Sequence, residues 1–304
     1  MKKYISLVLL FTLSFGINSQ QVADTTYNPP IKNPIYEQGK GSVVFIDEGH
    51  HNFHTKEGRY KAFANLVERD GYIVNRYKGS FTNENLSKGK ILVISNSLNE
   101  INVENWYLPT PSAFSEEEIK IVEQWVKDGG SLFLIADHMP MAGAAEDLAG
   151  VFGFEFTNGF VFHISTSQGT AYFETNDSTL VESRITKGRS ATENVKNVVS
   201  FTGQAFKIPS DATSVLKFNS EYVNTLPDTA WVFKDIPRTP VKGWSQGAYK
   251  KFGKGRVVVW GEAGMFTAQL AGPGKIKFGM SRDIAKENYQ LLLNIIHWLD
   301  GKLD

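Results

Sequence analysis

Short hydrophobic runs recur along the chain and predict buried strands. Continuous apolar runs of this length are typical of strands buried on both faces of a parallel sheet. The runs lie at 42–46, 72–75, 91–94 and 131–136. A later pair of segments, 243–252 and 255–260, predicts a hairpin that turns at Gly253-Lys254-Gly255.

Segments with helical spacing separate these runs. The best defined helix begins at Ser115, which forms a capping box with Glu118, and it ends at Gly129-Gly130. Further helices are expected at 55–69, 143–151 and 282–299. Strands and helices that alternate in this way predict right-handed βαβ units. The expected fold class is therefore α/β, with a doubly wound and mainly parallel sheet.

Two segments depart from the alternation. Residues 21–41 are polar and contain three prolines, which predicts a linker or a tail on the surface. From 154 to about 240 the helical periodicity fades, and threonine, serine, asparagine, phenylalanine and valine alternate. We therefore expect a single α/β domain over 42–304 that carries a β-rich insertion at about 154–240.

Residues 1–20 have the pattern of a signal peptide. Lys2 and Lys3 precede an apolar run at 5–15, and small and polar residues follow it. The run is too short to span a membrane, which takes about 20 apolar residues. No cysteine follows it, so a lipoprotein is not expected. This pattern predicts a periplasmic or secreted protein, and a retained N-terminal anchor is the alternative.

The composition excludes several classes of function. The chain of 304 residues has no cysteine, which excludes thiol nucleophiles and thiolate metal ligands and leaves stability to core packing. Lysine plus arginine equals aspartate plus glutamate at 32 each, so no basic excess favours a nucleic-acid partner. Neither G-x-G-x-x-G nor a P-loop is present to favour a nucleotide cofactor. The oligomeric state is left open.

Ionisable side chains follow four of the predicted strands. In an open parallel sheet, ligands bind beyond the C-terminal ends of the strands. Four of the six histidines lie in such segments, and loops on a rigid scaffold are where sites are commonly built. The four segments are 47–54, Ser95-Asn96-Ser97, Asp137-His138 and Gly261-Glu262. Any one of these histidines alone is more simply an ordinary surface or core residue, but the set favours a small-molecule site.

Two kinds of chemistry fit this set. In the first, histidines exchange protons with the substrate while carboxylates orient them. The expected catalytic residues are His50, His138, Glu48 and Glu262, and the expected substrate-binding residues are His51, Asn52, His54, Arg59, Tyr60, Asn96, Asp137 and His163. In the second, a divalent metal binds among His50, His54 and His138. No HExxH motif supports the metal, so the cofactor is expected to be either none or a divalent ion.

Three stretches of the chain resemble a known family. They are 43–50, the helix start Phe114-Ser115-x-x-Glu118, and the stretch 129–138 that ends in Asp137-His138. These look like the DUF4350 type of class I glutamine-amidotransferase-like domain, to which ThuA-like proteins are related. The resemblance covers about 42–160 and 243–300 and implies a flavodoxin-like sheet. Amidotransferases of this fold use a cysteine nucleophile, which this chain lacks, so glutamine hydrolysis by that route is excluded.

A second resemblance concerns the setting of the protein. The signal peptide and the general style resemble secreted flavobacterial proteins of polysaccharide-degradation systems. Some ulvan-degrading systems of this kind include an oligosaccharide dehydratase that acts on unsaturated uronate ends. This resemblance implies an exported lyase or dehydratase that acts on uronate-containing oligosaccharides. The alternatives are a non-catalytic module that binds a sugar or a protein, and a metal-assisted hydrolase.

Overall fold

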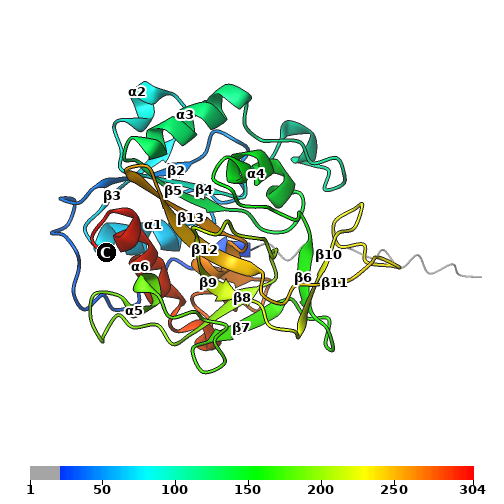
Figure 1. Cartoon of the computed structure of the whole chain (residues 1–304). Coiled ribbons are helices and arrows are strands. Elements are labelled where there is room, and N and C mark those ends of the chain that lie inside the picture. The colour runs from blue at the N-terminus through cyan, green and yellow to red at the C-terminus, as the bar shows by residue number, and fades with distance from the viewer. Residues whose placement is uncertain (1–20) are drawn as a thin grey trace, which may run out of the picture.

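A seven-stranded mixed sheet forms the centre of the molecule in the computed structural model, which describes residues 21–304 (Figure 1). Its strand order is β3-β2-β4-β5-β13-β12-β9. The strands are β3 (Ile73–Tyr77), β2 (Val43–Asp47), β4 (Ile91–Ser95), β5 (Ser131–Ile135), β13 (Gly255–Trp260), β12 (Ser245–Phe252) and β9 (Thr213–Lys217). The first five are mutually parallel, and β12 and β9 extend the sheet antiparallel. The α/β class predicted from the sequence is confirmed, and the sheet, which was expected to be mainly parallel, is mixed, with β12 and β9 added to five parallel strands.

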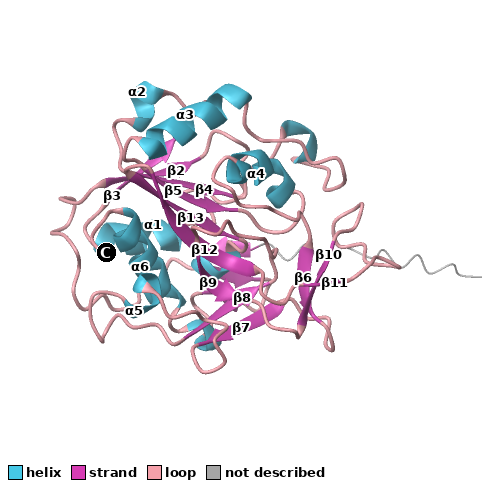
Figure 2. Ribbon diagram, viewed as in Figure 1, coloured by secondary structure: helices cyan, strands magenta, loops and turns pink. Residues whose placement is uncertain are grey.

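Helices cover both faces of this sheet, which is why its central strands are apolar on both sides (Figure 2). Alternate residues of β5 belong to different cores: Phe133 packs with the helices of one face, and Leu134 with those of the other. The first face carries α1 (Lys61–Arg69) and α6 (Asn288–Leu299). The second carries α3 (Glu116–Lys127) and α4 (Met141–Gly150), and the short α2 (Asn83–Leu86) contacts α3.

Several element boundaries differ from the expected ones. The first helix was expected from residue 55, but 55–60 forms turns and α1 begins at Lys61. The last helix was expected from residue 282, and a short 3₁₀ turn, η3 (Asp283–Ala285), precedes α6 instead. Gly272-Pro273-Gly274 turns a hairpin of β14 (Ala268–Ala271) and β15 (Ile276–Gly279) that the sequence did not predict.

Residues 154–240 fold mostly as short strands and loops. A small sheet joins β6 (Phe160–His163), β10 (Tyr222–Thr225) and β11 (Thr239–Pro240), and a hairpin-like pair joins β7 (Thr170–Glu174) to β8 (Asn197–Phe201). The single helix of this segment is α5 (Arg184–Lys187). Strand β9 does not stay apart, because it pairs with β12 and so forms one edge of the central sheet.

The segment 21–41 is not a free linker. Its first residues form β1 (Gln21–Ala23), which pairs antiparallel with β14. Further along, the Ile35 amide donates to Asp70, and the Tyr36 hydroxyl donates to Asp300. The segment therefore packs against the body of the protein over much of its length. The expected signal peptide at 1–20 lies outside the described residues.

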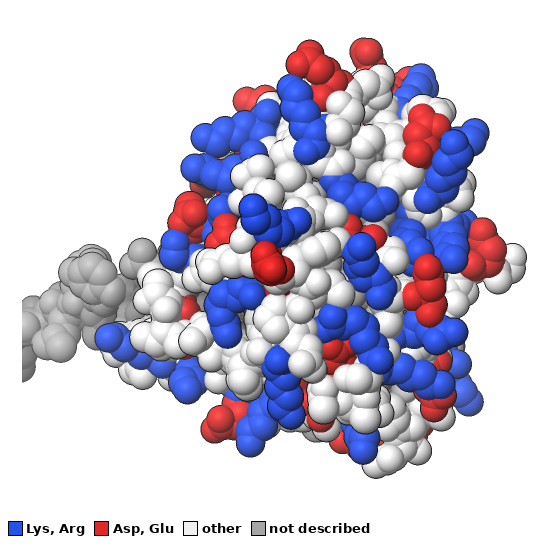
Figure 3. Space-filling view, turned by 90° about the vertical axis from the view of Figure 1, so that its left-hand side faces the viewer, with Lys and Arg blue, Asp and Glu red and all other residues white. Residues whose placement is uncertain are grey.

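Two surface properties bear on partners. Among the described residues, no helix combines the length and the apolar character that crossing a membrane requires. Basic and acidic side chains are interspersed over the face shown in Figure 3, in keeping with their equal numbers in the sequence.

Candidate active site

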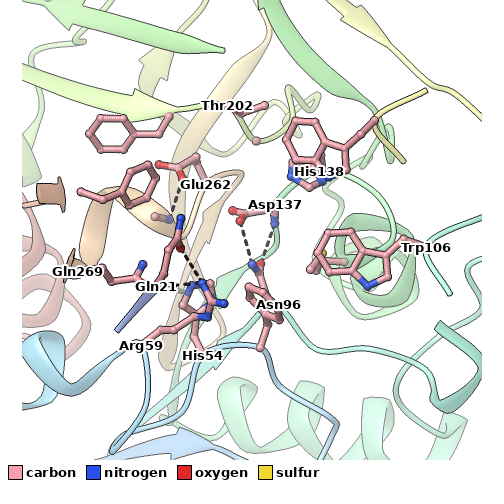
Figure 4. Close-up of a pocket in the computed structure, with 17 residues that line it drawn as sticks. Gln21, His54, Arg59, Asn96, Trp106, Asp137, His138, Thr202, Glu262 and Gln269 are labelled. Atoms are coloured by element: carbon pink, nitrogen blue, oxygen red, sulfur yellow. Dashed lines mark hydrogen bonds between the residues drawn. The ribbon is translucent and has the colours of Figure 1, made fainter. Parts of the chain in front are cut away.

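A pocket of about 560 Å³ lies at the C-terminal ends of three neighbouring strands, β4, β5 and β13. Those strand ends contribute Asn96, Asp137 and Glu262 to its lining (Figure 4). The position agrees with the general rule that an open parallel sheet binds ligands beyond the carboxyl ends of its strands. The loop after β2, the 201–203 turn and strands β1 and β14 close the pocket from other sides.

Asp137 is held in place by Asn96 and by the turn after β13. The Asn96 side-chain amide donates to Asp137 Oδ2 at 2.8 Å, and the Asp137 amide donates to Asn96 Oδ1 at 2.9 Å. The Ala263 amide donates to the other carboxylate oxygen. Asn96 adopts a left-handed backbone (φ 49°), a conformation in which asparagine is over-represented. These bonds fix both the position and the orientation of the Asp137 carboxyl group.

Glu262 lies at the start of the 3₁₀ turn η2 (Gly264–Phe266) and is buried. Its two carboxyl oxygens accept hydrogen bonds from the Gly264 amide at 2.7 Å and the Met265 amide at 2.8 Å. Gly203 packs directly against this residue: it has a positive φ of 83°, and a Cβ there would clash with Gly261 O and approach Glu262. Only glycine therefore allows the 201–203 turn to pass so close to the carboxyl group.

The two carboxyl groups have raised pKa values. Burial raises the pKa of Glu262 to about 8, with a further increase from the charge of Asp137, and the two backbone donors only partly oppose this. Burial also raises the pKa of Asp137 to about 6, against the effect of Asn96 and Ala263. The raised pKa values favour a pair that keeps one proton between its two carboxyl groups near neutral pH, and the larger increase at Glu262 favours that residue as its holder. An acid and a base in one pocket is the arrangement that proton-transfer enzymes need.

His138 forms part of the pocket wall beside this pair. Its Nδ1 donates to the Met139 carbonyl oxygen at 2.7 Å, since a carbonyl can only accept, and this leaves Nε2 as the ring's acceptor. The ring stacks on Phe160 with centroids 4.0 Å apart and meets Trp231 edge-on at 4.8 Å. Burial lowers the pKa of His138 to about 4, so the ring is neutral at pH 7.

His54 also lines the pocket and has an unpartnered nitrogen. Its ring lies 4.7 Å from that of Tyr60, and its Nδ1 is buried without a hydrogen-bond partner among the described residues. Burial, assisted by the charge of Arg59, lowers the pKa of His54 to about 3, so this ring is neutral as well. A buried polar atom without a partner is uncommon in folded proteins and calls for an explanation, such as a catalytic role or a bound water.

Arg59 supplies the positive charge of the pocket. One guanidinium nitrogen donates to Gln21 at 2.7 Å and, at 3.4 Å, to Gln269, and the group lies 4.1 Å from the centroid of the Phe53 ring. These partners are neutral, so no carboxylate among the described residues forms an ion pair with Arg59. The guanidinium is thus positioned by amides and an aromatic face while its charge stays available to an anionic ligand.

Aromatic rings complete the walls of the pocket. Trp106 lies on the side of His138 (Figure 4), where Trp231 also packs against the histidine ring. Phe201 and Phe278 pack against each other, and Phe278 lies beside Gly264. Flat apolar faces beside a few hydrogen-bonding groups are typical of pockets for small polar ligands.

His50, expected to be catalytic, lies outside this pocket. Its Nδ1 is 2.9 Å from Asp47 Oδ2 and its Nε2 is 3.0 Å from Glu118 Oε1, while Phe81 and Phe114 pack against the ring. Carboxylates can only accept, so both nitrogens donate and the ring is an imidazolium. Burial alone would lower the pKa of His50, but the bonds to the two carboxylates outweigh it and raise the pKa. These contacts give His50 a structural part, joining the end of β2 to the start of α3.

Other expected site residues also lie outside the pocket. Asn52 donates to Asp47, Glu48 forms an ion pair with Arg76, and His51 is exposed. Tyr60 is fully buried against Phe63 below the pocket floor, where it supports His54. His163 lies on β6 and does not reach the pocket. Of the expected residues, the structure brings together His54, Arg59, Asn96, Asp137, His138 and Glu262.

The described residues lack the cluster of metal ligands that the metal hypothesis requires. Within residues 21–304, no group of three or more histidine, aspartate or glutamate side chains is arranged to hold an ion. His54 and His138 share the pocket, but His50 has both nitrogens engaged with carboxylates elsewhere. The donor set therefore does not fit the proposed three-histidine site.

Several pocket residues were missed in the sequence, among them Gln21, Gln269, Gly203 and Trp231. Gln21 and Gln269 reach Arg59 through the β1–β14 pair, which joins the two ends of the described chain. No local pattern marks such a pairing. Gly203 could have been suspected from the sequence, because Thr202-Gly203 interrupts the β-rich segment with residues that favour a turn.

Comparisons with known proteins inform the fold. No protein-family profile and no curated protein sequence matches this chain. Among solved structures, the mmIFT52 N-terminal domain superimposes with a TM-score of 0.56 at 13% identity, over 85% of this chain and 97% of that one. This likeness shows a shared fold and nothing about activity.

Two bacterial structures are also similar. A putative ThuA-like protein from Bacteroides uniformis ATCC 8492 gives a TM-score of 0.44 at 13% identity, over 91% of this chain and 96% of that one. The cytoplasmic protein STM1381 from Salmonella typhimurium LT2 gives 0.47 at 14% identity, over 84% and 98%.

Proposed function

We propose that this chain is an exported hydro-lyase that removes water from uronate-containing oligosaccharides by acid–base chemistry. The observation that carries the proposal is the pair of buried carboxyl groups, Asp137 and Glu262, in one pocket with an arginine that has no acidic partner within residues 21–304. Burying two like charges costs stability, and such pairs with raised pKa values are concentrated at functional sites.

The charges of the pocket favour an acidic substrate. Arg59 would form a charge-assisted hydrogen-bond pair with a sugar carboxylate, the interaction for which a guanidinium is best suited. His54, neutral and with an unpartnered nitrogen, would contribute a further hydrogen bond. The aromatic walls suit the apolar faces of a sugar ring.

The pocket contains groups that could serve as the base and the acid that elimination of water requires. A base removes the proton from the carbon beside the one that bears the leaving hydroxyl, the C–H electron pair forms the new C=C bond, and the C–O bond breaks. An acid protonates the departing oxygen, so that one water leaves and no oxidant or reductant is consumed. Ionised Asp137 or the Nε2 of neutral His138 would act as base, and protonated Glu262 as acid.

Sequence and topology support the rest of the proposal. The order of the five parallel strands, counted along the chain, is 2-1-3-4-5, which supports the flavodoxin-like class. The pattern of residues 1–20 supports export to the periplasm or beyond.

The test is direct. The protein is incubated with unsaturated uronate oligosaccharides produced by polysaccharide lyases, and mass spectrometry follows the loss of one water per chain. Neutral oligosaccharides of equal length are the control and should stay unchanged. If the folded protein alters no uronate substrate across a broad panel yet binds some of them, it is a non-catalytic sugar-binding module, and the proposed reaction is wrong.

A further inference from the structure

A second, smaller pocket lies beside the one described above. Its volume is about 220 Å³, and it is formed by the β6–β10–β11 sheet together with the loop that precedes β11. Trp231 lines both pockets, so the two lie next to each other and share this side chain as a wall. Neither the sequence motifs nor the proposed reaction assigns this second pocket a role.

Its walls are built from ordered aromatic rings. Phe160 and Phe162 are two residues apart on β6 and therefore share a face of the strand; their rings are parallel within 3°, with centroids 6.1 Å apart. The ring of Phe233 meets each of them edge-on at 5.0 Å. Since Phe160 also stacks on His138, one aromatic array runs from the first pocket into the second.

Trp231, which lies between the two pockets, has an unfavourable backbone conformation. More than half of the side chain (54%) is exposed, and its backbone has a φ of 67°. A bulky residue seldom adopts this left-handed conformation, which costs of order 1–3 kcal/mol and tends to be kept where function requires it. An exposed indole held in this way offers its ring to a ligand that crosses from one pocket to the other.

Arg238 supplies an unneutralised charge at the second pocket. It is exposed, and its single hydrogen bond to a side chain is a long one of 3.4 Å to the Ser167 hydroxyl. No carboxylate within the described part of the chain lies close enough to form an ion pair with it. An apolar pocket with one free cation at its edge fits a ligand that has an apolar face and an anionic group.

We propose that this second pocket is a binding subsite for the next sugar of an oligosaccharide whose terminal residue occupies the first pocket. The inference rests on the proposed function for the terminal residue. The neighbouring sugar lies with its apolar face against Trp231 and Phe233, and its anionic substituent pairs with Arg238. The site therefore selects acidic chains of at least two residues over single sugars.

Calorimetric binding tests the subsite without relying on turnover. The probes are a uronate monosaccharide and an acidic disaccharide, both saturated, and mass spectrometry after each titration checks that neither has lost water. The wild-type protein should bind the disaccharide roughly tenfold or more tightly than the monosaccharide. Arg238→Gln should weaken disaccharide binding about tenfold or more, as expected for a lost charge-assisted bond. Arg184→Gln, an exposed arginine on α5, is the matched control and should bind like the wild type.

The outcomes separate the two proposals. Equal affinity for one and two residues, or unchanged disaccharide binding by Arg238→Gln, overturns the subsite even if dehydration is observed. Conversely, length-dependent binding that is sensitive to Arg238 supports the subsite even if no substrate loses water. Repeating the titration with a disaccharide whose terminal residue is acidic and whose second residue is neutral tests the charge preference of Arg238 separately from that of Arg59. Binding that does not fall relative to the fully acidic disaccharide also overturns the proposal.

Discussion

Two clusters of histidine and carboxylate follow the strands of the same sheet, and they are built in opposite ways. In one, the His50 imidazolium is shared between Asp47 and Glu118, aromatic rings fill the space around it, and every charge has a partner. In the other, Asp137 and Glu262 face a cavity, and no cationic side chain of the described residues is bonded to either. Both clusters lie at strand ends, so that position alone does not identify a site. The candidate site differs because its carboxyl groups lack a bonded cation among the described residues and border a cavity.

The sharpest test of this comparison removes the proposed acid. Glu262→Gln takes away the proton that Glu262 holds at neutral pH and should lower kcat/KM on an uronate oligosaccharide by about 10²-fold or more, the usual contribution of a general acid. The rate of water loss measures it. Glu174→Gln, an exposed residue on β7, is the control. Equal rates for wild type and Glu262→Gln would remove Glu262 from the reaction.

Replacing His50 in the first cluster should lower the stability of the protein. His50→Ala leaves the buried carboxylates Asp47 and Glu118 without their shared cation, and breaking a buried ion pair in this way typically costs about 3–5 kcal/mol. Urea unfolding measures the loss. The imidazolium has a raised pKa, so its contribution is fully present below pH 6.5 and disappears as the pH rises through the folded-state value. A variant as stable as the wild type at pH 6 would contradict the structural role.

Glu262 should make the stability of the folded protein depend on pH, and its raised pKa gives the direction of that dependence. Between pH 4.5 and 8 the folded protein keeps the Glu262 proton that the unfolded chain has lost, so the free energy of unfolding falls as pH rises. Relative to the wild type, the stability of Glu262→Gln should therefore increase as the pH rises across this window. Urea unfolding at pH 5, 6 and 7 gives the slope. A difference that does not change with pH would show that Glu262 has an ordinary pKa in the fold.

A further prediction concerns Arg59. Arg59→Lys keeps the charge but loses the planar donors that Gln21 and Gln269 position, so KM for uronate substrates should rise about tenfold with a smaller change in kcat. Steady-state kinetics on uronate substrates measures both parameters. A fall confined to kcat would instead place Arg59 in the chemical step.

The smallest effect is expected at Gln21. Gln21→Ala removes one of the bonds to Arg59 while Gln269 remains, so KM should rise only a few-fold, in line with the loss of one hydrogen bond to a charged group. Val22→Ala on the same strand is a suitable control, because the Val22 side chain is exposed. A larger rise in KM for Gln21→Ala than for Arg59→Lys would contradict the prediction that Arg59 contributes more to substrate binding than Gln21 does.

Sequence reasoning predicted the sheet better than the site. The strands β2, β4 and β5 were found because burial on both faces forces a local run of apolar residues, and α3 because a capping box is local too. Asp137 and Glu262 followed from the rule about strand ends. The same rule misplaced His50, since it cannot tell which way a side chain turns once the strand has ended. Gln21 and Trp231 were missed because distant pairings bring them to the pocket.

The pairing of β1 with β14 has a consequence for how the protein acquires its activity. Gln21 at one end of the described chain registers with Ala271 near the other, so this side of the pocket closes only once nearly the whole polypeptide is available. Contacts between residues so distant in sequence form slowly compared with local ones. The parallel strands β2, β4 and β5 lie within 43–135 and pair with one another without β14, so a nascent or partly refolded chain would possess this part of its sheet before its complete binding site. Recovery of ligand binding during refolding should therefore lag behind the recovery of secondary structure.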